Sequence, residues 1–343
     1  MFRFHRLDQE TIPWERLDAF QDRTIFQTRP WLEFLEASQG VEPVVIEIRQ
    51  GDQVVGYFTG AFLKKFGVRI LGSSFPGWTT AYMGFNLLPG VPRGEVAQGL
   101  IRYAFSELKC WHIEINDQHL RIEDIRSAFP RADYKLTEGW VLDISGTEET
   151  VFKRMNSDRR RCVKKAQDRG LVVEAASDEG FADDYYAQLV DVFKRQGLAP
   201  TYPIERVRLL IRHLLPSGQL LLVRVRDPET GACIGTGIYP AFNGTMFFWG
   251  GAAFRSQLHH HPNESMHWFA IRYWRDKGMT SYDMMGGGYY KSRYGGDPTD
   301  SHWIRVSRLG LLMFLRDQAK RLVRLRQRLR GRFQRTQPEL QGA

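Results

Sequence analysis

Runs of mainly apolar residues separated by polar turn residues predict two β-hairpins in separate halves of the chain. Each hairpin is followed by a third strand, a loop, a helix with apolar residues at helical spacing, and a short final strand. Between the second and third strands of the later half, Asn243-Gly244 is a strong tight-turn signal. The predicted elements are strands 43–49, 54–63 and 68–71, helix 94–110 and strand 112–115 in the first half, and strands 220–225, 232–241 and 245–249, helix 263–277 and strand 281–285 in the second.

The repeated order of elements indicates an internal duplication. Residues 54–56 (Val-Val-Gly) and 233–235 (Cys-Ile-Gly) also match at corresponding positions. We therefore expect a mixed α/β (α+β) fold of two tandem lobes, each a mixed β-sheet flanked by helices. The expected boundaries are a first lobe at 1–150, a second lobe at 151–310 and a C-terminal tail at 311–343.

Composition and charge are consistent with two globular lobes. The 343 residues suffice for two domains of ordinary size, and 43% of them are hydrophobic. The net charge is +9, but Arg316 to Arg335 hold nine basic residues against the single acid Asp317, so this stretch contributes +8. The remaining chain is nearly neutral, which argues against a protein that wraps nucleic acid over its whole surface.

The tail has the pattern of a basic amphipathic helix. Leu322, Leu325, Leu329 and Phe333 recur on one helical face among the basic residues. Such a helix is typical of contact with an anionic membrane surface, and a disordered or RNA-contacting tail is the alternative. The sequence also lacks a signal peptide and an apolar run of membrane-spanning length. We expect a cytoplasmic protein, with peripheral attachment to the inner face of the membrane through residues 316–335.

No metal or disulfide framework is expected. The three cysteines lie far apart, without the paired spacing of a zinc site or of a disulfide scaffold, and fit a reducing compartment. The run His259-His260-His261 does not by itself build a tetrahedral site, because adjacent imidazoles point in different directions. A polar loop is the simpler interpretation of this run.

Several ordered blocks carry a family likeness. Residues 155–170 form a basic segment that begins Met-Asn-Ser-Asp-Arg-Arg-Arg, and residues 282–295 read Tyr-Asp-Met-Met-Gly-Gly-Gly-Tyr-Tyr-Lys-Ser-Arg-Tyr-Gly. Blocks at 193–202, 248–251 and 262–264 lie between them in the expected order. Together these blocks resemble the FemAB-like branch of the GNAT superfamily of N-acyltransferases.

The resemblance implies a function for each lobe. FemAB-like proteins are tandem GNAT folds that join an acyl or aminoacyl group to an amine, often on a cell-envelope precursor. The resemblance therefore implies a first lobe on the acceptor side and a catalytic second lobe. It also implies a small-molecule or lipid-linked amine acceptor and no tightly bound cofactor. The co-substrate is acyl-CoA or aminoacyl-tRNA.

Two departures from the family bear on the donor. Residues 254–261 read Phe-Arg-Ser-Gln-Leu-His-His-His, where ordinary GNAT enzymes carry the glycine loop that holds the CoA pyrophosphate. The chain also lacks the long helical-hairpin insertion of some tRNA-dependent members. The second departure gives acyl-CoA a slight preference.

Four residues are candidates for catalysis. Direct amine acylation needs a positioned amine and a hydrogen-bond donor aimed at the carbonyl oxygen that becomes negative. It needs no enzyme nucleophile. Lys291 follows the Gly286–Gly288 bend and could neutralise a phosphate or the oxyanion, and Asp283 could orient or deprotonate the amine. Glu264 is a second candidate base, although an acid in the first turn of a helix is favoured by the helix dipole alone. Tyr290 could donate a phenolic hydrogen bond.

The remaining candidates would bind substrate, and each has a bland alternative. The basic helix offers Arg160, Arg161 and Lys164 for phosphate, or simply a solvated face. The family blocks place Tyr202, Trp249 and Tyr294 in the second lobe and Trp78 and Tyr82 in the first, and aromatic packing explains them nearly as well. The alternative function is a non-catalytic membrane-surface or nucleic-acid-binding protein on a degenerate acyltransferase scaffold.

Overall fold

The computed structural model describes residues 1–65, 67–195 and 197–308, and these residues form two compact units. Unit 1 contains Met1–Trp140, Met285–Gly288 and the described residues from Pro298 onward. Unit 2 contains Val141–Met284 and Tyr289–Asp297. The chain therefore enters unit 2 before the expected boundary at residue 150 and later returns to unit 1. The expected tail at 311–343 lies outside the described residues.

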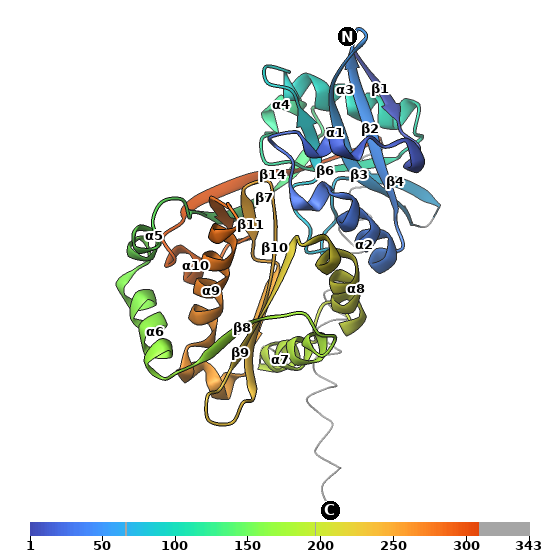
Figure 1. Cartoon of the computed structure of the whole chain (residues 1–343). Helices are drawn as coiled ribbons and strands as arrows, with labels where there is room; N and C mark the ends of the chain where they lie inside the picture. The colour runs from blue at the N-terminus through green and yellow to red at the C-terminus, as the bar shows by residue number, and fades with distance from the viewer. Residues whose placement is uncertain (66, 196, 309–343) are drawn as a thin grey trace, which may run out of the picture. The chain divides into compact units, whose positions relative to one another are not determined.

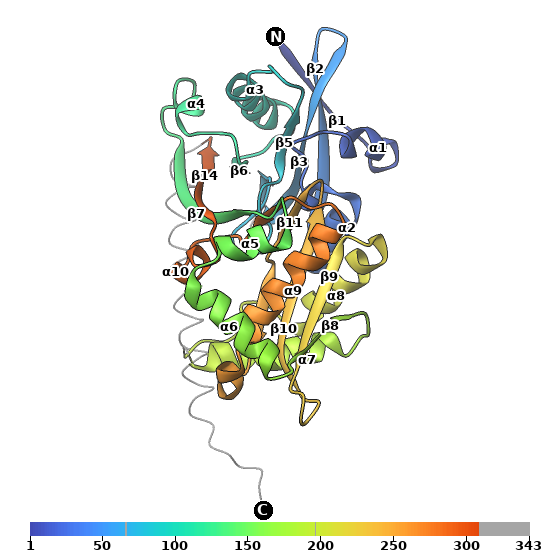
Figure 2. The same cartoon turned by 60° about the vertical axis from the view of Figure 1, so that its left-hand side comes forward.

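Unit 1 is built on a mixed sheet with helices on both faces. Its strand order is β1-β2-β3-β4-β6-β14, followed by the first part of β7, and β5 pairs with β3 beside β4. Helix α2 packs on β2, and α3 packs on β1 and β6 from the other face (Figure 2). Its elements are β1 (Phe2–Arg6), η1 (Gln9–Thr11), α1 (Trp14–Asp18), η2 (Ile25–Gln27), α2 (Arg29–Gln39), β2 (Glu42–Gln50), β3 (Gln53–Lys65), β4 (Val68–Gly72), β5 (Gly84–Leu87), α3 (Arg93–Ser106), β6 (His112–Asn116), α4 (Glu123–Arg126), most of β7 (Asp133–Asp143) and β14 (Asp297–Ser307).

Unit 2 has the same kind of layered architecture. Its strand order runs from the end of β7 through β13, β11, β10 and β9 to β8, and β12 also pairs with β10. Helix α9 lies on one face of this sheet with α6 beside it, and α7 lies on the other face (Figures 1 and 2). Its elements are α5 (Glu148–Arg154), α6 (Ser157–Asp168), β8 (Val172–Ala176), α7 (Phe181–Arg195), α8 (Ile204–Leu214), η3 (Leu215–Ser217), β9 (Leu220–Arg226), β10 (Cys233–Phe242), β11 (Thr245–Phe247), β12 (Gly250–Ala253), η4 (Arg255–His260), α9 (Pro262–Asp276), β13 (Ser281–Asp283) and α10 (Tyr289–Ser292).

The two units repeat one topology, as the hydrophobic pattern predicts. In unit 1, β3 pairs antiparallel with β4, helix α3 follows, and β6 returns parallel to β4. In unit 2, β10 pairs antiparallel with β11, helix α9 follows, and β13 returns parallel to β11. Each crossover helix buries an apolar stripe on its sheet; in α9 the stripe includes Met266, Ala270, Ile271 and Trp274. The expected mixed α/β fold of tandem lobes is confirmed.

The structure corrects three of the predicted elements. The strand predicted at 245–249 ends at Phe247, and the one predicted at 281–285 ends at Asp283, because Met285 has the left-handed φ of 48°. The helix predicted at 94–110 ends at Ser106, ahead of Lys109, which also has a left-handed φ, of 55°. Of the candidate site residues, Asp283 ends β13 and Trp249 lies two residues beyond the end of β11.

A close backbone contact ties the chain after α10 to the turn between α5 and α6. A Cβ on Gly295 would lie 2.2 Å from the carbonyl oxygen of Arg154, and Gly295 has a φ of +85°. The amide of Asn156 also donates to the carbonyl of Arg293 at 3.0 Å. Only glycine fits this approach, so the segment that follows Lys291 is held against the start of the basic helix.

We expect Gly295→Ala to lower the free energy of unfolding by roughly 2–4 kcal/mol, because it adds a backbone clash to the strain of a positive φ. Gly278→Ala is the matched control, since Gly278 has a φ of +86° but nothing within 4 Å of its Cβ position. The control should lose only about 1 kcal/mol. Urea unfolding of both variants gives the comparison, and equal losses would show that the close approach is not rigid.

Candidate active site

A break in one strand of unit 2 creates the centre of the site. The last residues of β10 pair with β11 and its earlier residues pair with β12, so Phe248 and Trp249 lie between the two short strands. The amide of Phe248 donates to the carbonyl of Asp283 at 3.0 Å, which links the break to the end of β13. A Cβ on Gly250 would lie 2.5 Å from the Tyr185 hydroxyl, so the strand resumes with a residue that has no side chain.

Unit 1 has a strand break at the corresponding place. There the later residues of β3 pair with β4 and its earlier residues pair with β5. The loop between β4 and β5 contains Trp78 and Tyr82. Both side chains are only 7% exposed, and the ring centroid of Trp78 lies 4.9 Å from that of Phe75. The predicted acceptor-side residues thus occupy the same topological position in unit 1 as Trp249 does in unit 2.

Lys291 is buried beside the break of unit 2. Its side chain emerges from α10, is 8% exposed, and donates from Nζ to the carbonyl oxygen of Met284 at 2.8 Å. The Nζ atom also lies 5.7 Å from the centroid of the Phe248 ring and 5.8 Å from that of Tyr290. These distances allow cation–π attraction to both rings. The preceding bend is open to solvent, since Gly287 and Gly288 are exposed.

The charge of Lys291 is set by two opposing effects. Burial lowers the pKa of its ammonium from 10.5 to about 8, and the carboxylate of Asp283 offsets part of that change. Asp283 is itself 1% exposed at the end of β13. The two residues predicted to carry the chemistry therefore interact electrostatically inside unit 2.

A buried histidine lies next to this pair and was not a sequence candidate. His267 of α9 is 2% exposed, and its Nδ1 atom is 2.7 Å from the Tyr282 hydroxyl and 3.2 Å from the Tyr239 hydroxyl. Burial, assisted by the positive charge of Lys291, lowers the pKa of His267 to about 3. The imidazole is therefore neutral at ordinary pH. A lone histidine in an apolar helix resembles a core residue, so the sequence carries no clear signal for it.

The two predicted tyrosines of the last block have different surroundings. Tyr294 is buried against His267, with ring centroids 4.9 Å apart, and burial raises the pKa of its hydroxyl well above 10. Tyr290 is 48% exposed and presents its ring to the Lys291 ammonium. Tyr294 thus packs with the buried cluster, whereas Tyr290 can reach solvent.

Glu264 is held by an arginine of the basic helix. It is 8% exposed in the first turn of α9 and forms an ion pair with Arg159, which also contacts Asp158 at 3.2 Å. The carboxylate is well placed to stabilise the N-terminus of α9. Its predicted role as a base would require this ion pair to open.

The predicted phosphate-binding residues divide into two groups. The guanidinium of Arg160 donates to the carbonyls of Lys153, at 2.9 Å, and Met155, so it closes the turn between α5 and α6. Arg161 and Lys164 are exposed on α6. Of the three, these two are the ones that present charge to solvent.

The structure brings Tyr202 and Trp249 together. Their ring centroids are 5.6 Å apart, and the Tyr202 hydroxyl lies 2.9 Å from that of Tyr185. Arg206 packs over the Tyr202 ring at 5.2 Å, and burial lowers the pKa of its guanidinium to about 10. These residues form an aromatic and cationic cluster on the α7 and α8 side of the break.

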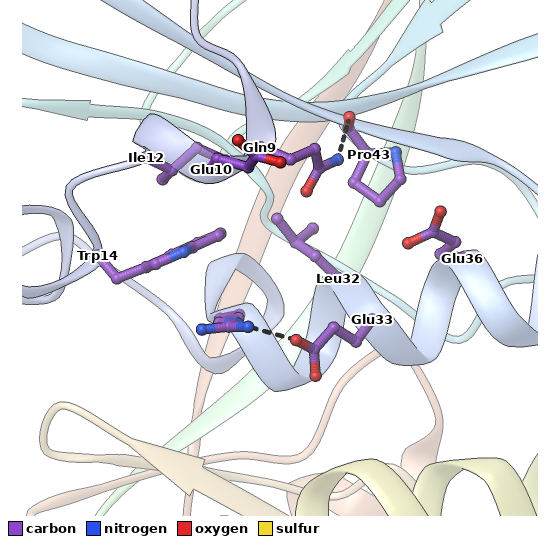
Figure 3. Close-up of a pocket in the computed structure, with 9 residues that line it drawn as sticks. Gln9, Glu10, Ile12, Trp14, Leu32, Glu33, Glu36 and Pro43 are labelled. Carbon is purple, nitrogen blue, oxygen red and sulfur yellow. Dashed lines mark hydrogen bonds and ion pairs between the residues drawn. The ribbon is translucent and has the colours of Figure 1, made fainter.

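A cavity of about 410 Å³ lies elsewhere, in unit 1 (Figure 3). Arg29 and Glu33 form an ion pair at its edge, with Nε and Oε1 2.8 Å apart. None of the predicted site residues lines this cavity, so we place the candidate site at the break of unit 2. The lining residues are Gln9, Glu10, Ile12, Trp14, Arg29, Leu32, Glu33, Glu36 and Pro43.

In the described part of the chain, no group of three or more His, Cys, Asp or Glu side chains could hold a metal ion. Among the helices of the same residues, none has the length and the apolar content that crossing a membrane requires.

Comparisons with known proteins define the class. Residues 153–294 match the model of the acetyltransferase (GNAT) domain family. The solved structure of FemX is similar over 91% of this chain and 99% of its own, with a TM-score of 0.70 at 14% identity. A tandem GNAT protein from the clavulanic acid biosynthesis pathway is similar over 90% of this chain and 98% of its own, with a TM-score of 0.53 at 12% identity. Among curated protein sequences, none matches this chain.

These comparisons confirm the predicted class. Residues 153–294 are a GNAT domain, and the chain has the tandem GNAT fold of the FemAB-like kind. The protein is accordingly an acyltransferase. L-PGS from Bacillus licheniformis has a similar fold, over 84% of this chain and 94% of its own, with a TM-score of 0.50 at 9% identity.

We expect wild-type protein to gain stability relative to Lys291→Met as the pH rises from 8 to 10.5. In that window Lys291 of the unfolded chain keeps a proton that Lys291 of the folded chain has lost. The free energy of unfolding therefore rises with pH. The gain should be on the order of 1–3 kcal/mol. Urea unfolding of both proteins across this range measures it, and parallel curves would mean that the folded lysine titrates normally.

Proposed function

We propose that this acyltransferase moves an acyl group from acyl-CoA to an amine on a small or lipid-linked cell-envelope precursor. The observation that carries the proposal is the buried pair of Lys291 and Asp283 at the strand break of the GNAT domain. A buried lysine whose pKa is lowered by burial and partly restored by a carboxylate is a costly feature for stability, and such groups concentrate at functional sites.

The residues support direct transfer. The amine nitrogen attacks the thioester carbonyl, a C–N bond forms, and negative charge collects on the carbonyl oxygen. The Lys291 ammonium stabilises this oxygen, and Asp283 accepts the proton that the nitrogen loses. The C–S bond then breaks, and the CoA thiolate leaves and takes up a proton, so the products are an amide and free CoA.

The donor's phosphates would be held by α6. Arg161 and Lys164 supply solvent-facing charge next to α9, while Arg160 serves the turn. The first turn of α9 already holds the carboxylate of Glu264, which disfavours a phosphate at that helix end. This observation, with the FemX-like fold, makes aminoacyl-tRNA the second candidate donor, since its ester would react in the same way.

We expect Lys291→Ala to lower the transfer rate about 10²–10³-fold and Asp283→Ala about 10²–10⁴-fold, through loss of oxyanion stabilisation and of proton acceptance. Lys277→Ala, an exposed lysine at the end of α9, is the control and should retain activity. The assay offers acyl-CoAs and charged tRNAs with cell-envelope extracts and identifies acylated amines by mass spectrometry. An unchanged rate in both site variants would refute the assignment.

The non-catalytic alternative can be separated by removing the basic tail. We propose that residues 316–335 attach the enzyme to an anionic membrane surface on its cytoplasmic side. Chains ending at Gly310 should then keep turnover on a soluble acceptor while losing binding to anionic vesicles, as measured by sedimentation. A protein that acts only by binding through its tail would show no turnover before or after truncation.

A further inference from the structure

His267 contacts residues of several elements of unit 2 that surround Lys291 and Asp283. Its Nδ1 atom lies 2.7 Å from the hydroxyl of Tyr282, the residue before Asp283 on β13. The same nitrogen is 3.2 Å from the hydroxyl of Tyr239 on β10. One imidazole nitrogen thus connects the crossover helix α9 to two strands of the sheet.

The faces of the ring complete the arrangement. The imidazole centroid lies 4.6 Å from that of Phe248 and 4.9 Å from that of Tyr294. Phe248 belongs to the strand break and approaches the Lys291 ammonium. Tyr294 follows Lys291 by one turn, and its amide donates to the Lys291 carbonyl at 3.1 Å. The histidine is therefore packed against both segments that frame Lys291.

The neutral ring donates from one nitrogen and accepts at the other, and the tautomer sets which of them is Nδ1. Hydroxyl groups that face Nδ1 can donate to it when it is the acceptor. Burial raises the pKa values of Tyr239 and Tyr282 well above 10, so both keep their protons. The charged or titratable groups around the cluster include Lys291, Asp283, Tyr290 and Tyr294, with Glu264 and Arg159 behind Tyr294.

We propose that His267 is a positioning residue for acyl transfer. By accepting the Tyr282 hydroxyl at Nδ1, it fixes the end of β13 from which Asp283 acts on Lys291. Deleting this acceptor frees the strand end and weakens the effect of the carboxylate on the ammonium. The inference rests on the proposed roles of Lys291 and Asp283, and it adds the residue that holds them in register.

Three variants separate this role from simple packing. His267→Phe keeps a ring but removes the acceptor, whereas His267→Asn retains an acceptor oxygen near the position of Nδ1. Tyr282→Phe removes the donor of the same hydrogen bond. We expect the first and third to lower kcat roughly 10–100-fold, with KM for the donor changed by less than about 3-fold. His267→Asn should recover most of kcat. The double variant that combines His267→Phe with Tyr282→Phe should lower kcat no more than either single change does.

A second measurement does not depend on turnover. We expect the pKa of Lys291, followed by NMR on protein with ¹³C at the lysine ε-carbon, to fall below about 8 in His267→Phe, because Asp283 no longer supports the ammonium. Lys291→Met assigns the resonance. The falling alkaline limb of kcat/KM should move to lower pH in the same variant. Tyr273→Phe, which removes a hydroxyl elsewhere on α9, should change neither.

The results distinguish the two proposals. If His267→Phe folds and keeps wild-type kcat and Lys291 pKa, the positioning role is wrong even if transfer is confirmed. If no donor supports transfer by wild-type protein but the Lys291 pKa still falls, the proposed function fails and the control of Lys291 by His267 stands. If His267→Phe does not fold, Tyr282→Phe decides, since it removes the same hydrogen bond and keeps the ring.

Discussion

The candidate site depends on the cost of burying the Lys291 ammonium. A charged amine that leaves water loses hydration, and only specific partners restore part of that loss. Here the partners are the carbonyl of Met284, the carboxylate of Asp283 and the faces of two aromatic rings. These partners come from three segments of unit 2: the end of β13 and the residue after it, the strand break at Phe248, and α10 itself.

The strand break explains how a sheet can hold such a site. An unbroken strand would use every backbone group in ladder pairing and present its side chains in strict alternation. The interruption at Phe248 and Trp249 lets one residue approach Lys291 and the other approach Tyr202. Unit 1 has an interruption in the equivalent strand, so the feature belongs to the topology that the two units share.

Hydrophobic patterning predicts much of this fold and less of its site. Strands β2, β3, β9 and β10 are apolar runs bounded by turn residues, and α9 has helical spacing, so all were predicted within a few residues. The break at Phe248 was missed because apolar residues continue through it. Likewise, the pairing of Arg159 with Glu264 and the contacts of His267 join residues far apart in the chain, and no local pattern encodes them. Lys291 was predicted from the glycine bend before it and from the family likeness, and Asp283 from its place at the end of an apolar strand, whereas their surroundings are seen only in the structure.

The close approach of Gly295 to Arg154 has a mechanical consequence. The segment that carries Lys291 and the turn that starts the basic helix share a backbone hydrogen bond and a contact with no intervening side chain. Neither can shift by an ångström without displacing the other. Any displacement of the start of α6 is therefore transmitted through the backbone to the segment that carries Lys291.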